Sequence, residues 1–445
     1  MTAHSISDRH QELRSRVPSN LAWLFFGKGV AVLDSVIIGA IVARYLGPSQ
    51  LGILSYAASL LAIALPFLTF GFDRILVRDF VQAPNRRDAD FWLAVIFRLV
   101  LVCVVAAGGA ALLHSGTIEF SSPQEYRVLL ITLLGLLAVP LSVPVLLLES
   151  MVLSKWNVWV TNLWVLLAAL IRGVLVFCSA PLEAFAVTQV LFSIGVGLSL
   201  FAVLAKLGQL PTLCMPKISR LRELVAECWP LAISGIAVTL YMNADLSMLR
   251  WLKTPEEAGT YSVAASMSAL WYFIPVSLQS SLFPTLSLRH KQDAEAFRNE
   301  YQSFLNLIAI VTWCSLGIAY FVMPIFILML FGEGYRLSCE VFKIHACSLP
   351  FVFIGVAIQP LVDLGRFQRP LLAVLLIGMS VNLGLNAWLI PSFGGFGAAW
   401  ATVIGYAISS LGICLTPKGR PLAMMLVRSF FLCPLTSIHR ALRRG

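Results

Sequence analysis

Long apolar segments recur along the whole chain and limit what it can fold into. A helix needs about 20 residues to cross the roughly 30 Å hydrocarbon core of a bilayer. Twelve segments reach about this length: residues 20–46, 51–72, 91–113, 127–150, 156–180, 182–206, 229–252, 259–288, 303–331, 341–364, 370–390 and 396–415. The 445 residues are 59% hydrophobic and 12% charged, which is outside the range of soluble domains. We therefore expect an integral membrane protein with about twelve spans.

The form of these runs favours helices over a barrel. They are continuous, as in LVLVCVVAAGGAALL at residues 99–113, whereas a membrane barrel needs short segments of alternating polarity. In lipid, the backbone of a continuous run can satisfy its hydrogen bonds only as a helix. The sequence thus predicts an all-α fold.

Basic residues indicate which side of the membrane each connection faces. Lys and Arg total 32, and most of them lie before the first predicted span, after the last, or in every second connection. Because cytoplasmic connections carry an excess of Lys and Arg, we expect both termini in the cytoplasm. The formal charge of +10 follows from this bias, with attraction to anionic lipid heads as a second effect, and does not indicate nucleic acid as a partner.

A polar connection near the middle divides the spans into two sets of six. It reads KLGQLPTLCMPKISRLRELVAEC and carries two prolines. We expect the tail to lie at the membrane surface rather than to cross it, because Arg428 and Pro434 interrupt its apolar stretch. The predicted organisation is a cytoplasmic N-terminal segment at 1–19, a first lobe at 20–206, a cytoplasmic linker at 207–228, a second lobe at 229–415 and a basic amphipathic tail at 416–445.

Two short segments suggest that the lobes are repeats. GPSQLGILSYAAS at residues 47–59 and TPEEAGTYSVAAS at residues 254–266 match at a constant offset, with Pro48 opposite Pro255. Small residues at a helix start are also favoured by helix packing, so a chance match is the alternative. Repeats separated by an even number of spans share one orientation, and the substrate path then lies between them.

The sequence lacks the motifs that indicate an enzyme or a metal protein. It contains no G-x-x-x-x-G-K-[ST] loop and no H-E-x-x-H, and its nine cysteines have no C-x-x-C spacing. The connections are also too short for a separate catalytic domain. We expect no enzyme activity, no cofactor and no metal site.

Five charged residues lie inside predicted spans, where each costs about 3 kcal/mol or more unless it faces the protein interior or water. They are Lys28, Asp34, Arg98, Arg172 and Asp245. The first lobe holds all three cations, so its interior is expected to be net positive and to suit an anionic cargo. Lys28 and Asp34 are six residues apart, on different helix faces and about 9 Å apart along the axis, so each needs a partner from elsewhere.

Two other interpretations of these charges stay open. They can form interhelical ion pairs that fix the packing, and Arg98, near a span end, can extend its side chain to the membrane surface. Asp34 and Asp245 can instead take up a coupling proton or sodium ion.

The first part of the chain resembles a known family. Residues 20–80, NLAWLFFGKGVAVLDSVIIGAIVARYLGPSQLGILSYAASLLAIALPFLTFGFDRILVRDF, resemble flippases of the Wzx kind, which handle O-antigen and exopolysaccharide repeat units. These belong to the multidrug/oligosaccharidyl-lipid/polysaccharide exporter superfamily. The LGPSQLG element carries most of the resemblance, and twelve spans in two lobes fit the family plan.

The resemblance implies a MATE-like fold, with two six-helix lobes around a central cavity. It implies alternating access that moves an undecaprenyl-diphosphate-linked oligosaccharide across the bacterial inner membrane. Polymerase and chain-length proteins are then candidate partners. Within this scheme, Lys28, Arg98 and Arg172 are the expected cationic lumen, and Asp34 and Asp245 are either ion-coupling or structural.

Other functions remain as alternatives. A multidrug or cation antiporter of the same fold would bind its substrate through acidic residues, and the excess of interior cations disfavours it. A flippase for peptidoglycan precursors would be expected to carry further C-terminal spans. A membrane-embedded enzyme acting on lipid-linked sugars would need a larger outer loop.

Overall fold

The structure, a computed structural model, describes residues 27, 29–30, 32–116, 119–214, 217–364, 368–416 and 419–432. These residues form helices and their connections, and none of them lies in a strand. The chain divides into two compact units, Met1–Thr239 and Leu240–Gly445. The division falls inside one long helix, α10 (Ile218–Leu252).

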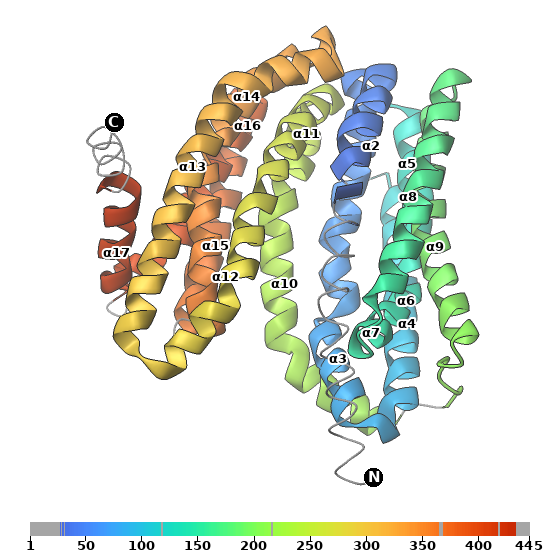
Figure 1. The fold of residues 1–445 in the computed structure, drawn as a ribbon. Coiled ribbons are helices and arrows are strands. Elements are labelled where there is room, and N and C mark those ends of the chain that lie inside the picture. The colour runs from blue at the N-terminus through green and yellow to red at the C-terminus, as the bar shows by residue number, and fades with distance from the viewer. Residues whose placement is uncertain are drawn as a thin grey trace. The chain divides into compact units, whose positions relative to one another are not determined.

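Unit 1 is a bundle in which α9 packs against both α5 and α8 (Figure 1). The short helix α3 packs against α4 and α7. Before the first half of α10, the elements are η1 (Asp34–Ile38), α2 (Gly39–Thr69), α3 (Phe72–Gln82), η2 (Pro84–Arg86), α4 (Arg87–His114), α5 (Pro123–Gly135), α6 (Ala138–Leu141), α7 (Val143–Ser150), α8 (Ser154–Phe177) and α9 (Leu182–Lys206).

Unit 2 is a second bundle, in which α13 packs against α12, α14 and α15, and α16 packs against α14 and α15. After the second half of α10, the elements are α11 (Pro255–Ala269), η3 (Leu270–Tyr272), α12 (Phe273–Gln292), α13 (Ala294–Phe331), η4 (Glu333–Tyr335), α14 (Arg336–Ala346), α15 (Leu349–Asp363), α16 (Gln368–Leu411), η5 (Gly412–Leu415), α17 (Arg420–Val427) and η6 (Arg428–Leu432).

The candidate membrane spans agree with the predicted ones. Within the described residues, nine helices are long and apolar enough to cross a membrane, or ten if the bent pair Glu333–Ala346 and Leu349–Val362 is one span. Two of the nine, Asp34–Thr69 and Pro370–Leu415, each contain two helices that meet at a glycine. If the bent pair is one span and each of these two helices is divided at its glycine, the described residues contain the twelve expected spans. The predicted start of the first span, at residue 20, lies outside the described residues.

The first of these junctions is at Gly47. Its φ of 72° and ψ of 171° lie in a region that is essentially reserved for glycine. Pro48 follows and starts the next helix, where its fixed φ fits and its missing N–H is not needed. The LGPSQLG element is therefore the turn between the first two predicted spans.

The matching segment in unit 2 begins a helix in the same way. Thr254 is the N-cap of α11, its side chain accepts a hydrogen bond from the backbone N–H of Glu257, and Pro255 follows at the first helical position. Residues 47 and 254 thus precede equivalent proline-initiated helices. This shared local structure supports an internal repeat over a chance match.

Connections that were predicted to lie on the same side of the membrane contact one another. On the predicted inner side of unit 1, the hydroxyl of Thr212 donates to Asp88 at 2.7 Å. On the predicted outer side, the Tyr45 hydroxyl donates to the carbonyl of Ala180 at 2.8 Å. The alternation of sides along unit 1 is thus consistent with the expected order of spans.

The C-terminal tail is described to residue 432, and residues 433–445 lie outside the described part. The amide of Gln302 on α13 donates to the Ser429 hydroxyl at 2.7 Å. The indole N–H of Trp313, also on α13, donates to the carbonyl of Phe430 at 3.0 Å. The described part of the tail therefore packs along α13, and its position at the membrane surface stays a prediction.

Candidate functional site

Arg172 on α8 and Asp34 at the start of η1 form an ion pair inside unit 1. The Nη1 of Arg172 lies 3.1 Å from Oδ2 of Asp34, and its Nη2 donates to Gln189 on α9 at 3.3 Å. Their side chains are 19% and 18% exposed, so the pair is largely but not fully enclosed. The partner that Asp34 was expected to need from another helix is thus Arg172.

The backbone around Asp34 departs from an α-helix. Residues Asp34–Ile38 form one turn of π-helix, after which α2 begins at Gly39. Such single turns often occur at functional sites. This turn places the Asp34 carboxylate beside α8, which packs against η1.

Arg98 on α4 is almost completely buried, with 1% of its side chain exposed. Its Nη2 forms an ion pair with Asp73 at the start of α3, and its Nη1 donates to the Ser142 hydroxyl at 2.9 Å. Its Nε has no hydrogen-bond partner within the described residues. In this conformation, Arg98 therefore joins α4 to α3 and to the break between α6 and α7, and it does not extend to the membrane surface.

These contacts change the expected charge of unit 1. Arg98 and Arg172, two of the three cations predicted to line the lumen, are each paired with an aspartate. Neither is therefore a free positive charge in this conformation. Asp73 was not predicted as a partner of Arg98 because it directly follows the second predicted span. The signal that could have indicated it is its place in the first turn of α3, where an acidic residue is favourable. Lys28 lies outside the described residues. The cargo-binding role of all three cations stays a prediction.

Asp245 on α10 is the centre of a buried polar group in unit 2. It is 5% exposed and accepts hydrogen bonds from the Tyr261 hydroxyl and from the backbone N–H of Leu246. The hydroxyl of Thr402 on α16 lies 3.4 Å from the same carboxylate. Asp245 is thus surrounded by neutral donors, which is compatible with either a structural or an ion-coupling role.

Asn382 and Asn386 on α16 are fully buried and bonded to each other. The amide of Asn386 donates to Asn382 at 3.1 Å. The Nδ2 of Asn382 and the Oδ1 of Asn386 have no partner among the described side and main chains. Their spacing of four residues places them on one face of α16, where the two side chains meet.

No cluster of metal-ligating side chains occurs in the part of the chain that the structure describes. A search of the described residues finds no group of three or more His, Cys, Asp or Glu side chains that could hold a metal ion. The contacts described above at Arg172, Arg98 and Asp245 are ion pairs and hydrogen bonds.

Comparison with known proteins gives a family match and two curated relatives, both probable flippases of Haloferax volcanii. The model of a family described as polysaccharide biosynthesis protein matches residues 17–290. The probable flippase AglR of Haloferax volcanii is 26% identical over 271 residues, which cover 58% of this chain and 54% of AglR. The chain thus spans about half the length of this curated relative.

Solved structures share the fold at low sequence identity. The Lipid II flippase MurJ in an inward closed conformation aligns with a TM-score of 0.71 and 14% identity, covering 94% of this chain and 92% of MurJ. An inward-facing multidrug resistance transporter of the MATE family aligns with a TM-score of 0.69 and 13% identity, covering 89% of this chain and 96% of that transporter. The fold is accordingly MATE-like, as the sequence predicted.

Proposed function

The chain belongs to the polysaccharide biosynthesis protein family, and we propose that it is a flippase that moves a lipid-linked glycan across a membrane. The name of the curated relative, probable flippase, supports this function. The fold shared with MurJ and a MATE transporter supports transport rather than catalysis.

The proposed cargo is an undecaprenyl-diphosphate-linked oligosaccharide repeat unit for O-antigen, capsule or exopolysaccharide. It would move from the cytoplasmic to the outer leaflet of a bacterial inner membrane by alternating access between the two units. Polymerase and chain-length proteins would act on the exported unit. The basic bias of the predicted inner connections supports the assignment of sides.

The observation that carries this proposal is the ion pair of Arg172 and Asp34. An arginine inside a predicted span is costly, yet among the described residues Asp34 is the one charged partner of Arg172, whose side chain remains partly exposed. A diphosphate is a stronger partner than a carboxylate because it offers more charge and accepts paired donors from a guanidinium. The cargo headgroup would therefore replace Asp34 at Arg172.

Release of Asp34 would leave a carboxylate without its cation. Such a group favours uptake of a proton or a sodium ion, which would couple cargo binding to an ion gradient. Asp245 in unit 2 is the second candidate for this coupling role, since neutral hydroxyl groups surround it. The remaining proposed lumen cations are Lys28 and Arg98.

The test is the distribution of the lipid-linked glycan across the membrane. Deleting the gene in its host should make lipid-linked repeat units accumulate with their sugars accessible only from the cytoplasmic side. Restoring the intact gene should return them to the outer leaflet. An unchanged distribution in the deletion strain would contradict the proposal, provided that no second flippase gene is present.

A further inference from the structure

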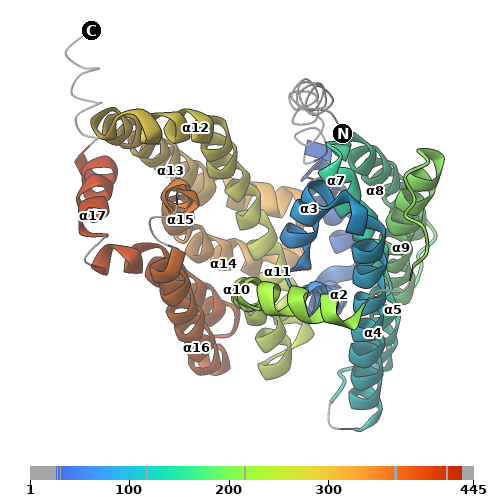
Figure 2. The same ribbon diagram turned by 90° about the horizontal axis from the view of Figure 1, so that it is seen from below.

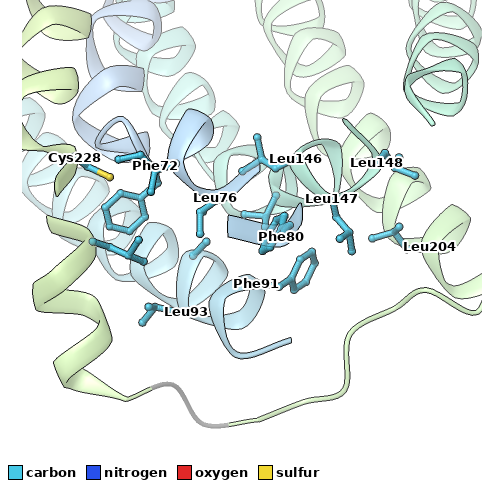
Figure 3. Packing of buried hydrophobic residues seen from close by; sticks show 14 of the residues in the cluster. Phe72, Leu76, Phe80, Phe91, Leu93, Leu146, Leu147, Leu148, Leu204 and Cys228 are labelled. Carbon is cyan, nitrogen blue, oxygen red and sulfur yellow. The ribbon is translucent and has the colours of Figure 1, made fainter. Parts of the chain in front are cut away.

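The first half of α10 is part of the core of unit 1. Within the predicted linker at 207–228, α10 begins at Ile218, and the side chains of Leu224 and Cys228 are fully buried. Leu224 and Cys228 belong to the same hydrophobic cluster as Phe72 and Leu76 of α3 (Figure 3). Because their burial removes apolar surface from water, these side chains attach this half of the helix to unit 1.

Arg220 adds an ionic attachment at the same place. Its Nε and Nη2 donate to the two oxygens of Asp90 on α4, both at 3.1 Å. The same Nη2 donates to Asp79 on α3 at 2.6 Å. Asp90 is 2% exposed, so this fork bridges two helices with little competition from water. Figure 2 shows the beginning of α10 beside α3 and α4.

Two more contacts attach α10 to α3. Arg78 donates to Glu227 at 2.6 Å. The corner between α2 and α3 lies against the backbone of α10, because a Cβ at Gly71 would be 2.9 Å from the Cβ of Leu231 and 3.0 Å from the N of Ala232. Gly71 also has a φ of 70°, so other residues are excluded both by space and by conformation.

The second half of α10 is attached to unit 2 instead. Asp245 is held by Tyr261, and the ring of Tyr241 lies 4.7 Å from the ring of Tyr406, edge to face. The stretch 235–240 between the two attached halves includes the division of the units and begins with a glycine, which weakens a helix interior relative to alanine. Pro230 removes one further backbone hydrogen bond just before it.

We propose that α10 is a two-part lever: residues 218–232 stay fixed in unit 1 throughout the transport cycle, and α10 bends within 235–240 when the units move. Arg220 is then a positioning residue, which keeps the lever attached by contacting Asp79 and Asp90. The proposal rests on the proposed function only in assuming that the units move during transport.

A chemical cross-link tests the fixed half. Arg78→Cys and Glu227→Cys are introduced together after the nine native cysteines are replaced, and a short bifunctional thiol reagent joins them. The cross-linked protein is expected to transport within about twofold of the same variant treated with a monofunctional reagent. A loss of tenfold or more would overturn the proposal, because it would mean that α10 must leave α3.

A matched control uses an ion pair of unit 1 that does not involve α10. Arg127 on α5 and Glu183 on α9 lie 2.6 Å apart. The double variant Arg127→Cys and Glu183→Cys, cross-linked in the same way, reports the effect of the reagent on unit 1 itself. If both cross-linked proteins lose transport, the loss is assigned to the reagent. The spin-label distances described next then test the proposal.

Distances between spin labels test the lever without a transport assay. Labels at 78 and 227 should give one distance with and without undecaprenyl diphosphate, whereas labels at 227 and 252, at either side of the proposed bend, should give a distance that changes. A changing 78–227 distance or a constant 227–252 distance would overturn the lever. Failure of the wild-type protein to transport would instead contradict the proposed function and leave these distances interpretable.

Arg220→Lys separates the ionic attachment from the hydrophobic one. Lysine keeps the charge but lacks the fork that reaches both Asp79 and Asp90. The 78–227 distance distribution is expected to broaden in this variant. An unchanged distribution would show that Arg220 does not position α10.

Discussion

Arg172 and Asp34 are 138 residues apart in the sequence, yet the Nη1 of the first lies 3.1 Å from the Oδ2 of the second. The pair joins α8 to the turn that precedes α2. Both partners lie well inside predicted spans, Asp34 in 20–46 and Arg172 in 156–180. Under the proposed function, its partial exposure would let an anionic cargo compete with Asp34.

We predict that Arg172→Gln abolishes most transport. The apparent affinity for the cargo should fall roughly 10–100-fold, since a hydrogen bond to a charged group contributes about 1.5–3 kcal/mol. Arg172→Lys, which keeps the charge but not the paired donors, should lose less. Transport rates of the purified proteins in liposomes, at equal protein content, should decrease from the unchanged protein to Arg172→Lys to Arg172→Gln.

The double variant Asp34→Asn with Arg172→Gln separates folding from binding. Arg172→Gln alone leaves Asp34 without its cation and should lower thermal stability, by less than the roughly 3–5 kcal/mol of a fully buried pair. Adding Asp34→Asn should restore the unfolding midpoint in detergent but not transport. If transport returns with stability, Arg172 has only a packing role.

We predict that Asp73→Asn destabilises unit 1. The change removes the negative charge beside the buried Arg98 guanidinium but keeps an amide oxygen that can accept from it. Because Asp73 is also half-exposed, the loss should be smaller than the roughly 3–5 kcal/mol of a fully buried pair. Arg98→Met combined with Asp73→Asn should recover part of this loss. The unfolding midpoint of the three proteins measures it, and an unchanged midpoint in Asp73→Asn would show that water already solvates Arg98.

In unit 2, we predict that Tyr261→Phe is more destabilising than Thr402→Val. Tyr261 donates directly to Asp245, and losing that donor should cost about 1–3 kcal/mol. Thr402 lies farther from the carboxylate and also donates to Ala398 at 3.0 Å, so its contribution to Asp245 is smaller. Thermal unfolding of the two variants gives the comparison, and the reverse order would mean that Thr402 is the main partner.

The spans could be predicted from sequence because lipid imposes a length and a polarity on each one separately. The turn at Gly47 lies in the gap between the first two predicted spans, and Gly47 and Pro48 are residue types that indicate a turn followed by a helix start. The ion pairs were not visible, because Asp73 and Arg98, like Asp34 and Arg172, meet only after the helices pack. The contacts of the predicted linker at 207–228 were not visible either, because its Arg220 meets Asp79 on α3 and Asp90 on α4 only after the helices pack.

We predict that Gly47→Ala destabilises the protein, whereas Gly39→Ala does not. A Cβ would meet no atom within 4 Å at either position, so the comparison isolates backbone conformation. Gly47, with φ of 72° and ψ of 171°, should cost about 1–3 kcal/mol when replaced. Gly39 is helical, with φ of −56°, and its replacement should be neutral or stabilising by up to about 1 kcal/mol. The unfolding midpoints of the two variants measure this difference, and equal midpoints would mean that the first two spans do not turn at Gly47.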